Sequence, residues 1–183
     1  MHAGPTMTAA HRAPSALYES HLDSPIGTLH MLTLDDALCW IGFGSEHSGG
    51  DATGWRRRHL APYMAEAAGS RHAMIHEQLL RYFDGRLKKF RVKTQLLGTD
   101  FQLQVWTALR AIAYGNTVSY QSIADAIGNP KASRAVGQAV GRNPISIIIP
   151  CHRVIGEHGS LVGYAGGIDR KKFLLQLEGA LLM

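Results

Sequence analysis

The chain has 183 residues, of which 45% are apolar and 18% charged, the composition of an ordinary folded domain or of two small ones. Its net charge of +5 suits a polyanionic partner, although a modest excess of this kind also serves solubility alone. No run of about 18 apolar residues could span a membrane, and two cysteines, Cys39 and Cys151, are too few for a disulfide framework, so we expect a cytoplasmic protein with reduced thiols.

The N-terminal part is expected to hold a tail and a β-meander. Residues 1–15 mix Gly, Pro, Thr, His and Arg without a continuous apolar stretch, which is not the pattern of a signal peptide and predicts a mobile tail. Residues 16–22, 28–34 and 37–43 are strand-like runs separated by turn-forming residues, and this spacing predicts three sequential strands. Cys39, inside the third run, has neither a base nor a charge beside it in sequence, so packing in the core is its expected role.

A loop, a helix and one more strand are expected next. Gly, Ser and Asp dominate residues 45–54 and predict a loop, and the three arginines at 56–58 indicate a solvated basic face. Apolar residues recur at helical spacing over residues 70–83, and Gly85 stands just past the end of that helix. Residues 87–92 alternate basic and apolar side chains in the manner of a strand.

Two histidines in this helix, His72 and His76, are four residues apart, a spacing that could hold a metal ion. No third cysteine or acidic ligand lies nearby in sequence, so no metal site is predicted. Residues 93–98 are expected to link two domains, an N-terminal α/β domain over residues 16–94 and a C-terminal domain over residues 99–183.

The second half is predicted to open with a helix. The sequence Thr-Asp-Phe-Gln at 99–102 has the form of a capping box, which satisfies amide groups that the first turn of a helix leaves free. Phe101, Val105 and Leu109 continue at helical spacing until residues 113–116 break the pattern.

A helix-turn-helix is predicted in the middle of this half. Residues 119–127 show a short helical pattern that ends at Gly128, and Asn129-Pro130 places a cap and a first-turn proline ahead of a second helix over residues 131–140. Alanine, serine and glycine cover most of the second helix, which allows either tight packing inside the protein or close approach to another surface. The long side chain of Arg134 projects from this surface of small side chains.

Cys151 has the most informative neighbours in the chain. Ser-Ile-Ile-Ile at 146–149 predicts a buried strand, and Pro150 ends it by removing a backbone donor, so we expect Cys151 at a rigid strand end. A cysteine after isoleucines is often a small core side chain, but a thiol beside an imidazole and a guanidinium can be a nucleophile, because such groups lower its pKa. His152 and Arg153 supply both groups.

The last part of the chain is predicted to be a loop and a helix. Residues 156–159 indicate a turn, and residues 160–167 a glycine-rich loop that could wall a pocket. Residues 168–177 predict a helix, and Glu178, which closes it, would by itself be a solvated acid at a helix end.

The motif Pro-Cys-His-Arg-Val at 150–154, with Asn143-Pro144 before it and Gly-Tyr-Ala-Gly-Gly at 163–167 after it, resembles the active-site signature of the O6-alkylguanine-DNA alkyltransferases, also called methylated-DNA-protein-cysteine methyltransferases. The resemblance extends over residues 99–179 and, more weakly, over residues 24–27. It implies an α/β fold of the two-domain α+β type. An N-terminal RNase H-like domain, a β-meander plus helix, would precede a helical C-terminal domain with a DNA-binding helix-turn-helix and the active-site cysteine.

This resemblance implies DNA repair by direct reversal. Cys151, as thiolate, would displace guanine from the alkyl carbon on O6, or thymine from that on O4, and keep the alkyl group without any cofactor. His152 would act as the base through a water, and Glu178 would orient it. Asn143 would tie the turn that holds the cysteine, and Tyr120 would supply a proton to the departing base. Because a thioether is a poor leaving group, each molecule would act once, as a suicide methyltransferase.

The resemblance also implies a partner, double-stranded DNA that carries O6-alkylguanine, bound in its minor groove by a monomer. Arg134 matches the arginine that replaces a nucleotide swung out of the stack, which is needed because the damaged atom lies inside a stacked base pair. The other positions that match DNA contacts are Tyr120, Gln121, Asn129, Gln102, Ala132 and Ser133. Those that match the alkylguanine pocket are Val140, Val154, Tyr164, Ala165 and Gly166. Family members often have serine where this chain has Ala165, so the backbone donor remains there but a hydroxyl contact is lost.

Two other functions stay open. A non-enzymatic lesion-binding relative has the same architecture but replaces the cysteine, usually with tryptophan, and the presence of Cys151 argues against it. A helix-turn-helix protein whose Cys-His-Glu set hydrolyses an ester or amide would be a hydrolase. Only an alkyltransferase gains one alkyl group permanently after meeting alkylated DNA, so the mass of the intact protein distinguishes the three.

Overall fold

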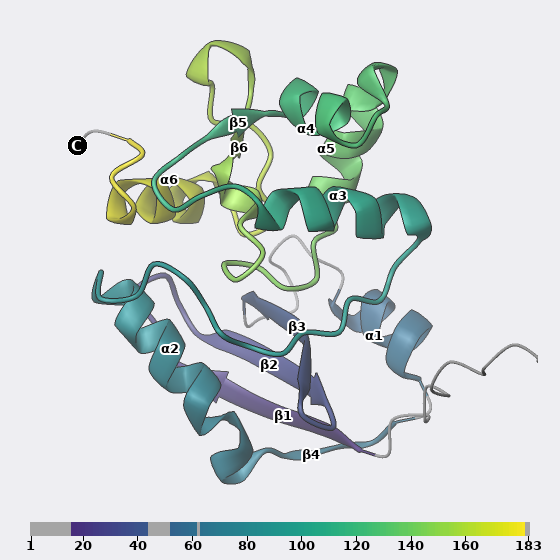
Figure 1. Ribbon diagram of the computed structural model, residues 1–183. Helices are drawn as coiled ribbons and strands as arrows, with labels where there is room; N and C mark the ends of the chain where they lie inside the picture. Colours follow the sequence, from purple (N-terminus) through teal and green to yellow (C-terminus); the bar gives the residue numbers. More distant parts are fainter. Residues whose placement is uncertain (1–15, 44–51, 62, 182–183) are drawn as a thin grey trace, which may run out of the picture.

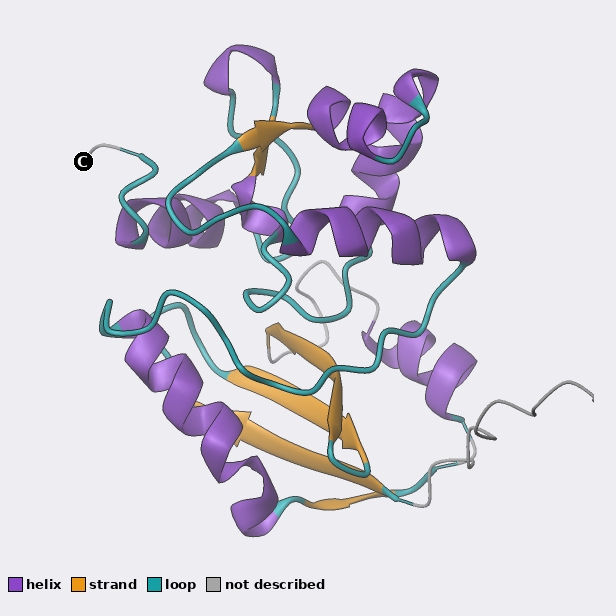
Figure 2. Cartoon of the chain, viewed as in Figure 1, coloured by secondary structure: helices purple, strands orange, loops and turns teal. Residues whose placement is uncertain are grey.

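The structure, a computed structural model, describes residues 16–43, 52–61 and 63–181. Figure 1 shows two halves, a sheet with helices beside it below and a group of helices above. Figure 2 shows that most of the strand structure belongs to the lower, sheet half. The α/β fold class expected from the sequence is confirmed. The expected tail at 1–15, and most of the expected loop at 45–54, lie outside the described residues.

The sheet half is built on a four-stranded sheet in the order β3-β2-β1-β4. Strands β1 (Leu17–Leu22), β2 (Leu29–Leu34) and β3 (Ala37–Phe43) form the predicted meander, antiparallel throughout, with Leu22 paired with Leu29 at the first hairpin. Five of the six residues of β2 are buried, because this strand lies inside the sheet and carries apolar side chains on both faces.

A short fourth strand and two helices complete this half. Strand β4 (Ala65–Ala67) pairs in parallel with β1, and its Ala-Glu-Ala sequence gives no strand signal. Helix α2 (Ala73–Phe83) confirms the predicted helix and follows a 3-10 turn, η1 (Gly69–His72). Helix α1 (Ala52–Leu60) carries the three arginines, and it overturns the loop prediction for residues 52–54. Burial of its Trp55 and Leu60 outweighs the local preference for a loop.

Residues 87–92 do not form the predicted strand. The chain meets the edge of β3 only after them, where the Leu38 N–H donates to the Lys93 carbonyl (2.9 Å) and the Gln95 N–H donates to the Leu38 carbonyl (2.8 Å). The next part of that edge is occupied by Ile145, which forms a bridge with Ile41. The alternating pattern is therefore present without an available sheet edge, and the segment remains irregular.

The helical half opens with α3 (Asp100–Arg110), and the predicted capping box is confirmed. The Thr99 hydroxyl accepts the Gln102 N–H (3.3 Å), and the Gln102 side-chain oxygen accepts the Thr99 N–H (2.9 Å). Together they fix the point at which the chain passes from the sheet half into the helical half (Figure 1).

The predicted helix-turn-helix is formed by α4 (Tyr120–Ala126) and α5 (Ser133–Gly141). Gly128 has a left-handed backbone (φ 72°) that suits the turn, and a 3-10 segment, η2 (Pro130–Ala132), leads into α5. Asn129 precedes this segment but its side chain makes no cap hydrogen bond, so the cap predicted there is wrong. A 3-10 turn has fewer free amide groups than an α-helical turn, and the Asn129 carbonyl accepts from Ala132 instead.

The remaining elements place the end of the chain against the middle of the helical half. Two short strands pair in parallel, and two 3-10 turns and a last helix complete the structure: β5 (Val118–Ser119), β6 (Val154–Ile155), η3 (Cys151–Arg153), η4 (Glu157–Gly159) and α6 (Ile168–Leu177). The last helix has the predicted bounds.

Residues 146–149 form a turn rather than the predicted buried strand. Only the preceding residue, Ile145, pairs with the sheet, through its bridge to Ile41. Ile147 then adopts a left-handed backbone (φ 72°), which is unfavourable for a β-branched residue by about 1–3 kcal/mol. All three isoleucines of the turn contribute to the core, so the apolar run reflects burial and not a strand, and Cys151 begins a 3-10 turn.

One hydrophobic core spans the two halves. It joins side chains of the sheet and α2, such as Leu29 and Leu79, to side chains of the helices above, such as Trp106 and Leu174. A smaller cluster on the other side of the sheet contains Cys39. None of the helices in the described part of the chain is long and apolar enough to cross a bilayer.

Candidate active site

Cys151 is buried, 4% exposed, and its sulfur is held by Asn143. The Asn143 side-chain nitrogen lies 3.1 Å from Cys151 Sγ and donates to the Ile149 carbonyl at 2.8 Å, while its oxygen accepts the Ile145 N–H at 3.1 Å. One amide side chain therefore fixes both ends of the strained turn and also faces the thiol.

Burial and two neighbouring side chains have opposite effects on the pKa of Cys151. Burial raises the pKa of the thiol, while the hydrogen bond from Asn143 and the charge of Lys171 act in the opposite direction. The Lys171 side chain is fully buried, and its ammonium donates to the carbonyls of Val154 (2.6 Å) and Val162 (2.8 Å). Burial lowers the pKa of Lys171 to about 8. The resting protein thus holds a neutral thiol beside groups that favour its anion.

His152 and Glu178 form a buried pair beside the cysteine. The Nε2 atom of His152 lies 2.9 Å from Oε1 of Glu178, and neither side chain is exposed. An ionised carboxylate can only accept, so this geometry assigns the proton to Nε2 and leaves the Nδ1 lone pair free. Nδ1 is buried and has no hydrogen-bond partner among the described residues. Burial lowers the pKa of His152 despite the raising effect of Glu178, which keeps the ring neutral and able to accept a proton.

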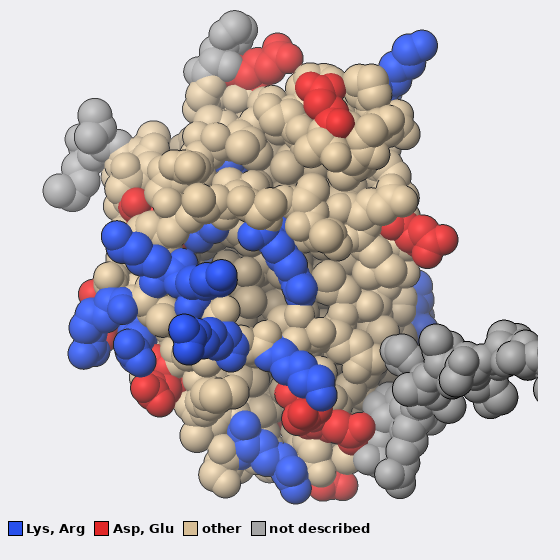
Figure 3. Space-filling model, in the orientation of Figure 1, with Lys and Arg blue, Asp and Glu red and all other residues tan. Residues whose placement is uncertain are grey.

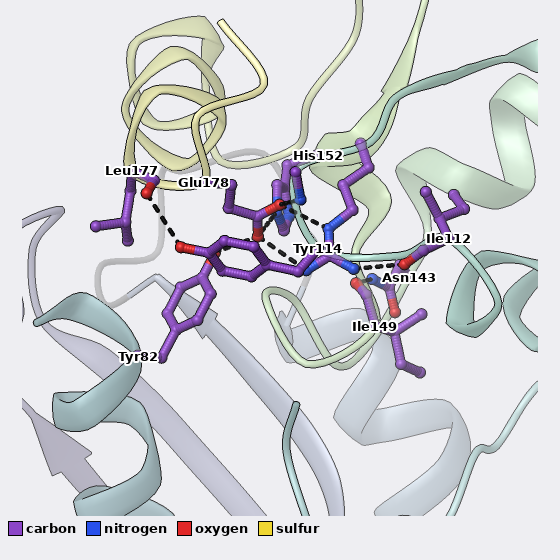
Figure 4. A network of polar contacts seen from close by, with 10 residues as sticks. Tyr82, Ile112, Tyr114, Asn143, Ile149, His152, Leu177 and Glu178 are labelled. Atoms are coloured by element: carbon purple, nitrogen blue, oxygen red, sulfur yellow. Dashed lines mark hydrogen bonds and ion pairs between the residues drawn. The ribbon is translucent and has the colours of Figure 1, made fainter. Parts of the chain in front are cut away.

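Glu178 is surrounded by donors (Figure 4). Its two oxygens accept hydrogen bonds from the Tyr82 hydroxyl (2.7 Å), His152 Nε2 (2.9 Å), Arg153 Nε (2.8 Å), Arg153 Nη2 (2.9 Å) and the Gly115 N–H (3.2 Å). Burial raises the pKa of this carboxyl, but the hydrogen bonds from His152, Arg153 and Tyr82 outweigh burial and hold the pKa well below its usual range. Glu178 is a buried anion and not the solvated acid that its position at a helix end indicates.

Arg153 does not act on the thiol in the way the sequence predicts. Its guanidinium makes two hydrogen bonds to Glu178, and its third nitrogen donates to the Ile112 carbonyl at 2.5 Å. The sequence analysis also missed Tyr82 and Lys171. Tyr82 gives no signal, because it lies far from the motif in sequence and resembles any core aromatic residue. Lys171 does give one, since it shares a helix face with Leu174 and Leu175, where a charge is out of place.

Tyr120 lies at the start of α4, where its hydroxyl donates to the carbonyls of Val162 (3.1 Å) and Gly163 (3.4 Å). Burial, and then the charge of Cys151, raises the pKa of this hydroxyl, so Tyr120 carries its proton at neutral pH. Gly163 has a left-handed backbone (φ 55°), and a Cβ atom there would lie 3.3 Å from the Tyr120 oxygen. The glycine-rich loop is thus shaped around the Tyr120 hydroxyl.

The expected DNA contacts do not all lie free on the surface. Arg134 is exposed on α5, and no hydrogen bond or ion pair of its side chain is seen in the described part of the chain. Gln121 instead ties the turn together, because its amide donates to Asp125 (2.9 Å) and to the Pro130 carbonyl (2.8 Å). Gln102 belongs to the capping box of α3. The remaining positions are the exposed Asn129 and the half-buried Ala132 and Ser133.

Three of the residues expected to form the alkylguanine pocket belong to, or pack against, the core cluster that contains Cys151. Val140, Val154 and Cys151 belong to one apolar cluster, against which the half-buried Tyr164 packs. The next residues in the same loop are Ala165 and Gly166, half-buried and buried respectively. A Cβ atom on Gly166 would lie 2.3 Å from the Phe43 ring, so only glycine lets the loop approach the sheet half so closely.

The two histidines at metal-binding spacing are joined by a hydroxyl. His72 Nδ1 (2.6 Å) and His76 Nε2 (3.0 Å) both lie within hydrogen-bond distance of Ser20 Oγ, and His72 Nε2 lies 2.9 Å from Thr33 Oγ1. Within the described ranges, no cluster of three His, Cys, Asp or Glu side chains could hold a metal ion.

Comparison with known proteins gives a consistent picture. Residues 100–180 match the family described as "6-O-methylguanine DNA methyltransferase, DNA binding domain". A methylated-DNA-protein-cysteine methyltransferase of Mycolicibacterium paratuberculosis is 45% identical over 157 residues, which is 86% of this chain and 89% of the relative. The protein with that name from Methanosarcina acetivorans is 62% identical over 103 residues, 56% of this chain and 66% of that relative.

The fold is similar to solved structures over nearly its whole length. The crystal structure of Mycobacterium tuberculosis O6-methylguanine methyltransferase superposes with a TM-score of 0.76 at 42% identity, covering 90% of this chain and 93% of that one. The Mycobacterium tuberculosis protein OGT in complex with DNA gives a TM-score of 0.76 at 44% identity, with 89% and 93% covered.

Proposed function

Because the chain belongs to the methylated-DNA-protein-cysteine methyltransferase family, we propose that it repairs DNA directly, by transferring an alkyl group from O6 of guanine to its own Cys151. The observation that carries this assignment is the arrangement around the sulfur. Asn143 contacts Sγ, and the neighbouring His152 has its Nε2 proton fixed by Glu178 and its Nδ1 free to accept. These are the nucleophile, base and orienting group that covalent catalysis requires.

The other cysteine does not meet these requirements. Cys39 lies in β3, where its Sγ donates to the Leu32 carbonyl (3.3 Å). Burial raises the pKa of Cys39 to about 12. Backbone hydrogen bonds act against this rise, but no side-chain donor or cation among the described residues does so, whereas Cys151 has Asn143 and Lys171. Cys151 is therefore the thiol that we assign as the acceptor.

The proposed reaction begins with removal of the thiol proton. His152 Nδ1 takes that proton through a water, and Glu178 stabilises the imidazolium that forms, while Asn143 and Lys171 stabilise the thiolate. The sulfur then attacks the alkyl carbon. A C–S bond forms as the C–O bond breaks, and the electron pair of that bond moves onto the guanine.

The departing guanine carries a negative charge and needs a proton. Tyr120 is placed to supply it, because its hydroxyl is protonated at neutral pH and lies against the loop that walls the pocket. The reaction is balanced without a cofactor. Because the product is a thioether, a poor leaving group, one protein molecule repairs one lesion. The same chemistry would apply to O4-alkylthymine.

The DNA-bound state that we propose uses α5 in the minor groove. Small side chains on that helix allow close approach, and Arg134 is the exposed cation placed to fill the gap that the flipped nucleotide leaves. A monomer is sufficient for this arrangement, because the assigned residues all come from one chain. We expect the protein to act in the cytoplasm, because a reactive thiol needs a reducing compartment.

Intact-protein mass spectrometry tests the proposal. After incubation with duplex DNA that contains one O6-methylguanine, the protein should gain the mass of one methyl group, located on Cys151 by peptide mapping. The two alternatives give other results. A lesion-binding protein would bind without any mass change, and a Cys-His-Glu hydrolase would return to its original mass after each turnover.

A further inference from the structure

A pocket of about 490 Å³ lies where the two halves meet, on the face seen in Figures 1 and 3. It is bounded by the irregular segment after α2, the end of α3 with the turn that follows, and the turn before Cys151. No residue of α4 or α5 lines it, so it is separate from the proposed DNA-binding helices. Figure 3 shows lysine and arginine side chains gathered around this boundary.

Three cations at the pocket have no carboxylate partner in the described part of the chain. Lys88, Lys89 and Arg110 line the pocket and are exposed, and Arg110 contacts only the Thr94 hydroxyl. By contrast, two nearby cations that do not line the pocket have acidic partners, since Arg86 pairs with Asp84 and Lys93 pairs with Asp36. The positive charge at the pocket is therefore available to an anion.

Two aromatic side chains also line the pocket. Phe90 and Tyr114 are half-buried in its wall, and the Lys88 ammonium lies 5.6 Å from the centre of the Tyr114 ring. Its volume falls in the range of about 300–1,000 Å³ that is typical of small-molecule sites. Unpaired cations beside aromatic rings match a ligand that joins a phosphate to a flat ring.

We propose that this pocket binds a nucleotide, with its phosphate on Lys88, Lys89 and Arg110 and its base against Tyr114 or Phe90. The phosphate can come from a free mononucleotide or from the phosphorylated end of a DNA strand, and the chemistry of the site is the same for both. Arg153 also reaches the pocket, but each of its nitrogens already donates to Glu178 or to the Ile112 carbonyl. We therefore leave it out of the phosphate site.

The test follows backbone amide signals of the ¹⁵N-labelled full chain by NMR. Deoxyguanosine monophosphate should shift the signals of Lys89, Arg110 and Tyr114, inorganic phosphate should shift the same signals more weakly, and deoxyguanosine should leave them in place. A short single strand with a 5′-phosphate, compared with the same strand without it, distinguishes a DNA end from a free nucleotide as the preferred source.

Substitutions then test the three cations. The triple variant Lys88→Gln/Lys89→Gln/Arg110→Gln should bind deoxyguanosine monophosphate weaker by on the order of 100-fold, because three charge-assisted contacts are removed. The matched control Arg57→Gln/Arg81→Gln/Lys172→Gln removes the same charge from exposed positions outside the pocket and should bind as the wild type does. Both variants should still transfer a methyl group from free O6-methylguanine, since neither alters the site around Cys151.

The proposal is overturned if the shifted amides lie elsewhere, if the triple variant binds like the control, or if deoxyguanosine shifts the signals as strongly as its phosphate does. Loss of methyl transfer in the triple variant alone would also contradict it, because the pocket would then belong to the reaction site. Failure of the wild type to transfer a methyl group would instead contradict the proposed function and leave the nucleotide result standing.

Discussion

The sheet half and the helical half each bury one cysteine, and the two thiols differ in the direction of their hydrogen bonds. Cys39 donates to a backbone carbonyl, whereas Cys151 faces the Asn143 amide, a donor. Burial raises the pKa of both thiols. Depth in the protein therefore does not distinguish a structural cysteine from a reactive one, but the side-chain amide of Asn143, aimed at the sulfur of Cys151, does.

The two halves also each bury one histidine almost completely, and the same contrast holds. His72 lies between the hydroxyls of Ser20 and Thr33, and burial followed by the charge of His76 lowers its pKa to about 4. Burial also lowers the pKa of His152, but its partner Glu178, an anion, acts in the opposite direction, which no neighbour does at His72. Hydroxyl partners leave a histidine as a fixed structural link, while a buried carboxylate prepares it to take a proton.

The largest effect is expected from replacing each cysteine in turn by serine. Cys151→Ser should abolish methyl uptake, because the hydroxyl is a far weaker nucleophile, while binding to DNA should stay largely intact because the groove contacts lie on other elements. Cys39→Ser in the sheet half should retain the activity. Uptake of labelled methyl by the Cys151 variant would show that the nucleophile is assigned wrongly.

A second pair of substitutions compares tyrosines. Tyr120→Phe should slow transfer by about 10²–10⁴-fold, the span of general-acid catalysis, with a smaller effect on binding. Tyr18→Phe, on β1 in the sheet half, should leave the rate unchanged. Single-turnover rates at saturating protein decide the matter, and an unchanged rate for Tyr120→Phe would mean that another group donates the proton.

A third comparison concerns buried charge and pH. Because the pKa of Glu178 in the folded protein lies below its ordinary value of 4.5, its contribution to stability is fully present above that pH and is lost as the pH falls below it. Glu178→Gln should lower the free energy of unfolding by about 3–5 kcal/mol at pH 7, since it leaves Arg153 without its partner, and should flatten the stability curve on the acid side. The control Glu66→Gln, exposed on β4, should do neither in urea titrations at pH 4 and pH 7.

The smallest effect concerns exposed arginines. Arg134→Ala should slow repair of a lesion in duplex DNA by on the order of tenfold, because extruding a base costs a few kcal/mol that the arginine partly offsets, and should leave repair of free alkylated base unchanged. Arg57→Ala, on α1 in the sheet half, should change neither rate. The measurement is the ratio of wild-type to variant rates on duplex and on free base at one salt concentration. Equal ratios would return Arg134 to a general electrostatic role.

Local patterns predicted most of the fold. The meander, the capping box at Thr99 and the bounds of α6 follow from alternation, caps and helical spacing, which act over a few residues. The predictions were wrong where contacts with residues far away in the sequence determine the local structure. The isoleucine run at 146–149 is apolar because it is buried. It does not form a strand, because the chain pairs with the sheet edge only at the preceding residue, Ile145.

The residues of the candidate site also differ in how far the sequence alone could identify them. The sequence placed Cys151 and His152 together because they are adjacent in the chain, but it connected Asn143 and Glu178 to them only through the resemblance to a family. It could not find Tyr82, 96 residues from the carboxylate that its hydroxyl contacts. Roles that depend on long-range contacts need the folded chain.

The two chain segments that cross the edge of β3 also protect the molecule from association. An edge strand offers unpaired amides and carbonyls to any other strand, and such edges template aggregation. Here the Leu38 and Ile41 amides are already occupied, by the carbonyls of Lys93 and Pro144. The second of these crossings is the same stretch of chain that leads to the reactive cysteine. Any displacement of that stretch would leave the Ile41 amide and carbonyl without these partners and would open this part of the edge to another strand.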